Sequence, residues 1–223
     1  MENLYKPSIV SEAVRRPNHS RCSDQLRCPW CLGDEDYTKY HDKEWGKPLK
    51  NSRKLFEFLI LDGAQAGLSW LTILKRRQGY REAFDGFDAE KIAAYGEKDI
   101  ARLMQDSRII RNRLKIRSAI GNARAYCAMA AGGKSFSKWL WDWVDGEPVV
   151  NRWRTLKEIP ASTELSEKMS KELKRLGFTF VGPTIIYAFI QAAGLVNDHL
   201  VSCFRWKELA DGITGPDHPG RRR

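Results

Sequence analysis

The chain has no apolar run long enough to cross a bilayer. Its 223 residues are 42% apolar, which is enough to bury a sizeable core. Near the start, Lys6, Pro7 and Ser8 interrupt the stretch Tyr5–Val10, so a secretory signal is not expected. These absences predict a soluble, cytoplasmic protein with no membrane partner.

Cysteine is scarce and odd in number, with five residues in the chain. A disulfide framework needs an even number of cysteines and an oxidising compartment. The number here is odd and the expected compartment is reducing, so we expect no disulfide framework. Metal ligation and simple burial are the roles that remain for the cysteines.

Strand patterns are nearly absent as well, and helical periodicity dominates, so we predict an all-α fold. Asn51 or Ser52 is a suitable N-cap for one of the helices. The expected helices are Asp34–His41, Arg53–Asp62, Trp70–Arg77, Asp88–Ala94, Lys98–Gln105, Ala119–Met129, Phe136–Val144 and Glu164–Leu176, followed by one that opens at Pro183.

Acidic residues are fewer than basic ones, 28 against 38, which gives a net charge of +10. Residues 1–27 and 215–223 each contribute +2, so +6 remains on the body of the chain. A surplus that survives removal of the tails favours a polyanionic partner such as nucleic acid.

The composition also suggests how the chain is divided. Residues 1–27 carry prolines, scattered charge and little apolar periodicity, which predicts a flexible basic arm. We expect one domain of two helical lobes over 28–206 and a flexible tail over 207–223.

A turn at Phe180, Val181, Gly182, Pro183 and Thr184 opens the last long apolar helix. Proline suits the first helical position, and glycine lets a ligand come close to the backbone. The free N–H groups of such a helix start attract anions, phosphate above all. The charged helix that ends at Gly177 precedes this turn, so the pattern predicts a helix–hairpin–helix motif; tight packing without a ligand is the alternative.

Two pairs of metal-ligand residues lie at opposite ends of the domain. His199 and Cys203 are four residues apart, which places them on one face if the segment is helical. Cys28 and His41 could complete a set of two thiolates and two imidazoles around one structural zinc ion, with Cys31 as a rival for Cys28.

Two further segments have the character of a ligand site. Asp62 precedes the small residues 63–69 and Trp70, so a carboxylate and an indole can line one pocket; tight helix packing is the alternative. Residues 108–117 contain five bases and no acid among isoleucine and leucine. We interpret them as an anchored basic ridge for a phosphate backbone, in which Arg111 and Arg113 are candidate contacts.

Several strings resemble one family and occur in its order. They are Cys28-x-Trp30, the motif from Tyr37 to Gly46, the motif from Ala64 to Trp70, Ile120–Arg124 and Gly194–His199. Over roughly Arg27 to Cys203 the sequence is similar to the bacterial DNA-3-methyladenine glycosylase I family, which belongs to the helix–hairpin–helix glycosylases.

This resemblance implies a monomeric hydrolase that flips 3-methyladenine out of alkylated double-stranded DNA and releases it, without lyase chemistry, in the first step of base excision repair. It implies one structural zinc ion on Cys28, His41, His199 and Cys203, which favours Cys28 over Cys31. It implies that the turn at 180–184 grips DNA. The implied base pocket consists of Tyr37, Tyr40, Asp62 and Trp70, framed by Trp30 and Trp45.

In two positions the resemblance needs comment. The family usually has glutamate where this chain has Asp62, which is one methylene shorter and is the candidate catalytic residue. Asp198 lies near the place of a catalytic aspartate in other helix–hairpin–helix glycosylases, but its neighbour His199 is the expected ligand, so we interpret Asp198 as an outer-shell or capping residue.

Two other functions compete with this prediction. A zinc-stabilised DNA-binding module without catalysis would explain the hairpin and the ridge, but it gives Asp62, Tyr40 and Trp70 no role. A zinc hydrolase would keep an open metal position, whereas four protein ligands close the site.

Overall fold

The computed structural model describes residues 25–211. Most of the predicted arm and most of the predicted tail therefore lie outside the described residues. The described residues at the inner ends of the arm and of the tail are joined to the domain. Leu26 accepts a hydrogen bond from the backbone N–H of Phe204 (2.9 Å), Arg27 binds Asp42, and the last helix continues past 206 to Asp211.

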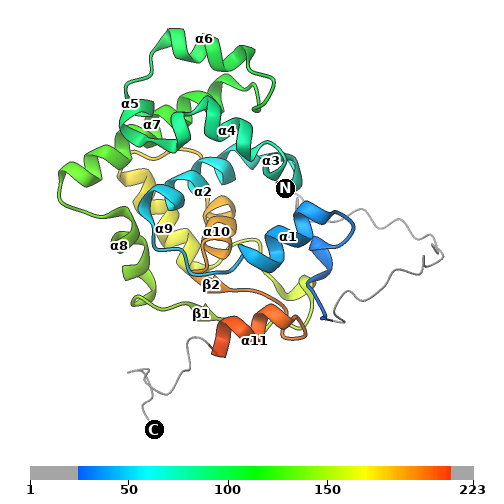
Figure 1. The fold of residues 1–223 in the computed structure, drawn as a ribbon. Coiled ribbons are helices and arrows are strands. Elements are labelled where there is room, and N and C mark those ends of the chain that lie inside the picture. Colours follow the sequence, from blue (N-terminus) through cyan, green and yellow to red (C-terminus); the bar gives the residue numbers. More distant parts are fainter. Residues whose placement is uncertain (1–24, 212–223) are drawn as a thin grey trace.

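The described chain is a helical array, so the predicted all-α fold is confirmed (Figure 1). Two strands of two residues each, β1 (Val149–Val150) and β2 (Val196–Asn197), pair in parallel with Val149 opposite Val196. Short 3₁₀ turns are Pro29–Cys31, Asp85–Phe87, Asp142–Val144 and Leu156–Glu158. The α-helices are α1 (Glu35–Lys43), α2 (Ser52–Gln65), α3 (Trp70–Leu74), α4 (Arg77–Ala83), α5 (Ala89–Ala93), α6 (Glu97–Gln105), α7 (Arg113–Ala131), α8 (Phe136–Trp141), α9 (Glu164–Arg175), α10 (Pro183–Ala192) and α11 (Phe204–Asp211).

Capping side chains set several helix starts. Asn51, one of the two expected caps, accepts the backbone N–H of Lys54 and begins α2. Helix α7 begins six residues before the predicted Ala119, because Asn112 accepts the N–H groups of Leu114 and Lys115. The second half of the predicted basic ridge is therefore the first turns of a helix.

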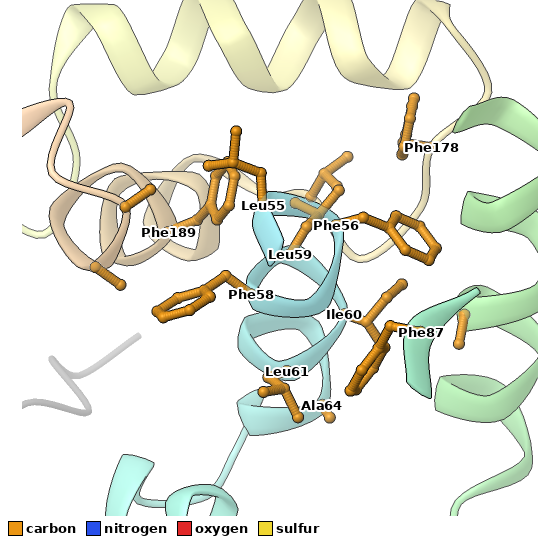
Figure 2. Packing of buried hydrophobic residues seen from close by; sticks show 14 of the residues in the cluster. Leu55, Phe56, Phe58, Leu59, Ile60, Leu61, Ala64, Phe87, Phe178 and Phe189 are labelled. Atoms are coloured by element: carbon orange, nitrogen blue, oxygen red, sulfur yellow. The ribbon is translucent and has the colours of Figure 1, made fainter. Parts of the chain in front are cut away.

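Helix α2 lies at the centre of the molecule, and its residues from Leu55 to Ala64 are all buried. Figure 2 shows Phe189 of α10 against one side of this helix and Phe87 and Phe178 against another. Because α2 is buried all round, the Asp62 carboxyl group lies in the protein interior.

Helices α9 and α10 pack against each other and form the expected hairpin (Figure 1). Gly177 ends the first helix in the left-handed region, with φ +91°, as predicted. Phe180 also has a positive φ, +53°, although it carries a side chain. A left-handed phenylalanine needs support from its surroundings, which makes the hairpin a specifically held turn.

The two ends of the described chain meet beside β2. A small cluster of buried residues, Cys28, Leu200 and Cys203, lies there apart from the large core. The large core takes residues from Tyr40 to Val196. The division of the domain into two lobes stays a prediction.

Candidate functional site

Four potential metal ligands converge where the chain ends meet. Cys28 precedes the first 3₁₀ turn, His41 lies on α1, and His199 and Cys203 follow β2; all four are buried. Their ligand atoms lie within 4.8 Å of one another, and among residues 25–211 this is the group suited to a metal ion. The predicted ligand set is thus brought together from both ends of the domain.

The spacing of these atoms fits a tetrahedral ion. His41 Nε2 lies 3.2 Å from His199 Nδ1, and Cys203 Sγ lies 3.4 Å from His41 Nε2 and 3.6 Å from His199 Nδ1. Metal bonds of about 2.3 Å to sulfur and about 2.0–2.1 Å to nitrogen place tetrahedral ligand atoms roughly 3.3–3.6 Å apart. A set of two cysteines and two histidines at these distances closes the coordination shell.

The two imidazoles are oriented by their second nitrogen atoms. Asp42 accepts from His41 Nδ1 at 2.8 Å and is itself held by Arg27, whose Nε donates at 3.0 Å. The carbonyl oxygen of Trp45 lies 3.1 Å from His199 Nε2. Such outer contacts fix the ring tautomers and leave His41 Nε2 and His199 Nδ1 facing the metal position.

Cys31 is outside this group, because its thiol donates to the Cys28 carbonyl oxygen at 3.1 Å. The choice of Cys28 over Cys31 agrees with this geometry. The segment from His199 to Cys203 is a turn and not a helix, and it is closed by the Cys203 N–H on the Leu200 carbonyl oxygen (2.7 Å). The turn brings the two side chains together as effectively as a helical face would.

Electrostatic effects within the cluster favour one thiolate. Hydrogen bonds from Cys28 and from the two histidines hold the pKa of the Cys203 thiol far below its usual range. Burial lowers the pKa of His199, which favours the neutral imidazole that binds metals. Burial lowers the pKa of His41, but hydrogen bonds with Cys203, Cys31 and Asp42 outweigh it and raise that pKa to about 10. Two thiolates and two imidazoles are the donor types that suit a soft or borderline divalent ion.

Two of the predicted pocket residues, Trp30 and Trp45, pack against the histidines of the four-ligand cluster, and Tyr37 packs on Trp30. The ring of Trp30 lies 4.9 Å from that of Tyr37 and 5.0 Å from that of Trp45, between ring centroids. Trp45 in turn packs edge-on against His199 at 4.6 Å. These aromatic contacts connect the ligand cluster to helix α1.

Two other predicted pocket residues form a separate pair. Tyr40 of α1 and Trp70, the first residue of α3, have ring centroids 5.5 Å apart and are both buried. Ser69 caps α3 by accepting the N–H of Thr72, which fixes the backbone at the tryptophan. The structure thus divides the predicted aromatic residues into this pair and the group around Trp30.

Asp62 is the most unusual side chain of the site. It is only 3% exposed, and its Oδ2 atom has no hydrogen-bond partner among the described residues. The Trp70 indole N–H is likewise buried and unpaired within residues 25–211. Burial raises the pKa of Asp62 well above the ordinary value. Buried polar atoms without partners are rare in folded proteins and indicate a ligand or a functional role.

A small cavity lies beside the same end of α2. Ile60 and Gly63 of α2, Lys115, Ser118 and Asn122 of α7 and Phe180 of the hairpin are among its lining residues. Asp62 and Trp70 do not line it. The cavity therefore lies between α2, α7 and the hairpin rather than at the predicted base pocket.

The hairpin exposes the start of α10. Gly182 is the N-cap and has no side-chain cap, and a Cβ atom on it would meet nothing within 4 Å. Ser170 of α9 donates to the Val181 carbonyl oxygen at 2.6 Å and so holds the turn from below. The start of this ten-residue helix is accessible to an anion, as the Gly-Pro pattern predicts.

Much of the predicted basic ridge is neutralised by acids. Arg108 pairs with Glu82 and Asp106, and Arg113 and Arg117 both lie against Glu97, at 3.5 and 2.7 Å. Arg111 is exposed and makes no ion pair with any residue of 25–211. Of the two arginines predicted to contact DNA, Arg111 is the one whose charge is available.

Asp198 is buried and fully hydrogen bonded. Its carboxylate accepts from Asn151 (2.6 Å), Trp153 (2.8 Å) and Gln191 (2.8 Å), and also from the Tyr187 hydroxyl group. This network ties α10 to the segment after β1. None of these four partners is one of the potential metal ligands, so the outer-shell or capping role of Asp198 stays a prediction.

Sequence reasoning missed three polar residues of α7. Lys115, Ser118 and Asn122 hydrogen bond to backbone atoms of the α2 end and of the hairpin. Lys115 had been included in the basic ridge, and Asn122 lies in the string Ile120–Arg124. The signal that could have found them is their spacing of three and four residues, which places them on one helix face.

A helical hairpin that exposes a helix start, four potential metal ligands gathered where the chain ends meet, and a buried carboxyl group with one oxygen unpartnered among the described residues are the features expected of a helix–hairpin–helix DNA glycosylase. The chain belongs to the methyladenine glycosylase family, whose model matches residues 30–206.

Curated relatives and solved structures agree with this family. The chain is 53% identical to DNA-3-methyladenine glycosylase 1 of Escherichia coli over 177 residues, which cover 79% of this chain and 95% of that protein. It is 50% identical to DNA-3-methyladenine glycosylase of Haemophilus influenzae over the same length, which covers 96% of that protein. A crystal structure of 3-methyladenine DNA glycosylase I superposes with a TM-score of 0.79 at 51% identity and covers 80% of this chain and 98% of the other.

A further solved structure describes 3-methyladenine recognition by the Staphylococcus aureus enzyme. It has a TM-score of 0.77 at 39% identity, and the match covers 79% of this chain and 94% of the other.

Proposed function

We propose that this chain is a DNA repair glycosylase that releases 3-methyladenine from alkylated double-stranded DNA. Membership of the methyladenine glycosylase family supports the reaction class. The observation that carries the proposal is the pair of unpartnered buried atoms, Asp62 Oδ2 and Trp70 Nε1, because an extracted base offers polar groups to both.

Base flipping is required by geometry, since the glycosidic bond of a stacked base cannot be reached. Phosphates on either side of the lesion would bind the exposed N–H groups at the start of α10 and the free charge of Arg111. Phe180, Val181 and Pro183 shape the turn, and Thr184 is exposed beside it. Together these groups would hold the backbone while one nucleotide turns out of the duplex.

The extracted base carries a positive charge as long as it remains bonded to the sugar. The faces of Tyr40 and Trp70 would stabilise that cation by roughly 0.5–2 kcal/mol each. Asp62 would accept a hydrogen bond from the exocyclic amine and favour the charge electrostatically, while Tyr37, Trp30 and Trp45 frame the pocket. Water would attack the sugar carbon as the base departs, which makes the reaction monofunctional hydrolysis.

We further propose that the ion at the four-ligand cluster is zinc and that it is structural. Two cysteines and two histidines occupy every tetrahedral position, so a metal there would hold the chain ends together and leave no site for an activated water. Four protein ligands on one ion disfavour a zinc hydrolase, which needs an open metal position. The hairpin, the metal cluster and the candidate pocket belong to a single chain, so the proposed unit is a monomer.

No helix within residues 25–211 has the length and apolar character needed to cross a membrane. The cytoplasmic location expected from the sequence remains a prediction.

Single-turnover release of 3-methyladenine from a methylated duplex tests the function. Asp62→Asn keeps the size of the side chain while removing its charge and half of its acceptor capacity. A hydrogen bond to a charged group contributes about 1.5–3 kcal/mol, so we expect Asp62→Asn to slow release by about ten- to a hundredfold.

Asp62→Glu serves as the control that keeps the charge and restores the residue usual in the family. Should wild-type protein bind the duplex without releasing base, the metal-stabilised DNA-binding module becomes the better interpretation. Should both variants match wild type, Asp62 does not lie in the pocket.

A further inference from the structure

One face of α7 contacts both the end of α2 and the start of the hairpin. Lys115, Ser118 and Asn122 follow one another at intervals of three and four residues, which aligns them along this face. Each of them hydrogen bonds to a backbone carbonyl oxygen outside α7.

Lys115 binds the last turn of α2. Its ammonium group donates to the carbonyl oxygens of Ala64 and Ala66, at 2.7 Å each. Carbonyl groups at a helix end have no partner within the helix, and a cation is favourable there. Asp62 lies two residues before Ala64, and Trp70 lies four after Ala66. Lys115 therefore fixes the backbone between the candidate carboxyl group and the candidate stacking ring.

Asn122 binds the entry to the hairpin. Its amide accepts the Thr179 backbone N–H at 2.8 Å and donates to the Thr179 carbonyl oxygen at 3.0 Å, while Ser118 lies 2.9 Å from the Thr179 hydroxyl group. The next residue, Phe180, has the left-handed φ of +53°. Two bonds to the backbone of the preceding residue supply the support that this conformation needs.

The two held segments meet in front of the same face. A Cβ atom on Gly63 would lie 3.5 Å from the Cβ atom of Phe180. Beside this contact, the small cavity lies between α2, α7 and the hairpin. No hydrogen bond joins residues 60–66 directly to residues 179–184 within the part of the chain that the structure describes. Their polar connection runs through α7.

We infer that Lys115 and Asn122 are positioning residues that hold the pocket-bearing end of α2 and the DNA-gripping hairpin at a fixed distance from each other. The inference rests on the proposed function. In this role Lys115 differs from the exposed cations beside it, because its ammonium group donates to two carbonyl oxygens of the protein and not to a phosphate. DNA that is held by the hairpin then presents its extracted base at the position of Asp62 and Trp70.

Lys115 is tested with matched substitutions in the full chain, assayed well below the lowest melting temperature. Lys115→Met keeps the aliphatic stem and removes the donors, whereas Lys115→Arg keeps a cation that can reach both carbonyl groups. We expect Lys115→Met to lower the plateau rate of single-turnover release at least tenfold with the half-saturating DNA concentration within twofold of wild type. Lys115→Arg should recover most of that rate.

Two further variants keep this test sharp. Lys54→Met is the control, since Lys54 is exposed in the first turn of the same α2 helix and should leave both parameters unchanged. Lys115→Gln retains a single neutral donor and should give an intermediate rate, which supplies the comparison if Lys115→Met does not fold.

Asn122→Ala provides the second arm. It should also lower the plateau rate, and the slope of DNA affinity against salt should not change because no phosphate contact is removed. Since both residues maintain one alignment, the double variant Lys115→Met/Asn122→Ala should be no more than about threefold slower than the slower single variant. Independent sites would give multiplied effects instead.

The outcomes separate the two levels of the argument. A wild type that releases no base overturns the proposed function and this inference with it. Wild-type release combined with unchanged plateau rates in the variants, or with multiplied effects in the double variant, overturns the inference alone.

Discussion

The carboxyl group of Asp62 destabilises the fold that contains it. It is 3% exposed, one of its oxygens is unpartnered among the described residues, and burial raises its pKa well above the ordinary value of 3.8. Below that ordinary value the group is protonated in both the folded and the unfolded states. As pH rises, the unfolded chain loses this proton more readily than the folded chain, so folding stability decreases from about pH 3.8 up to the raised pKa.

The Asp62→Asn variant should therefore be more stable than wild type near neutral pH. The asparagine does not ionise, so the difference in melting temperature should shrink toward zero as pH falls below 4. Thermal unfolding across this pH range measures it. A gain in stability combined with a loss of base release is the signature of a residue kept for function. A constant difference in melting temperature at all pH values would show that the buried charge is not responsible.

Gly194 illustrates a residue whose role depends on both conformation and space. Its φ is +73°, and a Cβ atom would lie 2.4 Å from the Lys47 carbonyl carbon and 2.6 Å from Pro48 N. We expect Gly194→Ala to lower the free energy of unfolding by about 2–4 kcal/mol, which combines left-handed strain with overpacking.

Gly133→Ala is the matched control for Gly194→Ala. Gly133 has a φ of +74° and nothing within 4 Å of a Cβ position, so only the strain of about 1–2 kcal/mol should appear. Chemical denaturation of both variants measures the difference. Equal losses would mean that the segment around Lys47 moves aside at little cost.

At the scale of single residues, the sequence indicated which residues could be ligands but not what surrounds each side chain. Spacing and residue type were enough to predict His41, His199 and Cys203 as ligands, because metal ligands are few and chemically distinct, whereas the choice of Cys28 over Cys31 came from the family resemblance. The unpaired state of Asp62 could not be predicted, since it depends on what α2 is packed against. The contact of Gly194 with Lys47 is equally invisible, because it joins segments far apart in the chain.

The basic ridge shows how neighbouring elements modify a charge pattern. Glu97 of α6 lies against Arg113 and Arg117, at 3.5 and 2.7 Å, although it is distant from both in sequence. A local run of bases is visible in the sequence, but it does not reveal the acid that another helix supplies. At 199–203 the four-residue spacing would align the two ligands on a helix, whereas in the structure they converge through a turn.

We predict unequal contributions from the two arginines to DNA binding. Arg111→Ala should reduce the slope of log affinity against log salt by about one. Without the contact between this guanidinium and a phosphate, DNA binding releases about one counterion fewer. Arg113→Ala should change the slope less, since Glu97 already neutralises part of its charge. Affinity measured at several salt concentrations decides between them.

Glu97→Gln is the companion variant for these two. It frees Arg113 and Arg117 and should increase the slope if the start of α7 faces DNA. An unchanged slope in both Arg111→Ala and Glu97→Gln would make the ridge a solvated surface with no role in binding.

At the scale of the molecule, the four-ligand cluster brings together the two ends of the domain, which are also joined by the hydrogen bond from the Phe204 N–H to the Leu26 carbonyl oxygen. Cys28 and His199 are 171 positions apart, and their side chains lie 3.7 Å from each other. The predicted closure of the two ends agrees with this arrangement. The all-α class was predictable because helical periodicity is a local property of the sequence. The arrangement of α2, α7 and the hairpin was not, since it depends on the packing of helices whose buried faces are not distinguished by their sequence.

Removal of the metal should therefore loosen both ends of the domain at once. A structural ion contributes folding energy only while its ligands are assembled, so Cys203→Ser should lose bound zinc and lower the melting temperature, and a chelator should have the same effect on wild type. Acidification should release the metal too, because protons compete for the thiolates and imidazoles.

Cys31→Ser is the control: its hydroxyl group can donate to the Cys28 carbonyl oxygen as the thiol does, so one zinc ion per chain and the wild-type melting temperature are expected. Elemental analysis and thermal unfolding of the same samples measure both quantities. Because the ion closes its shell with four protein ligands, chelated protein held below its melting temperature should still release base; loss of activity without loss of structure would give the metal a catalytic role instead.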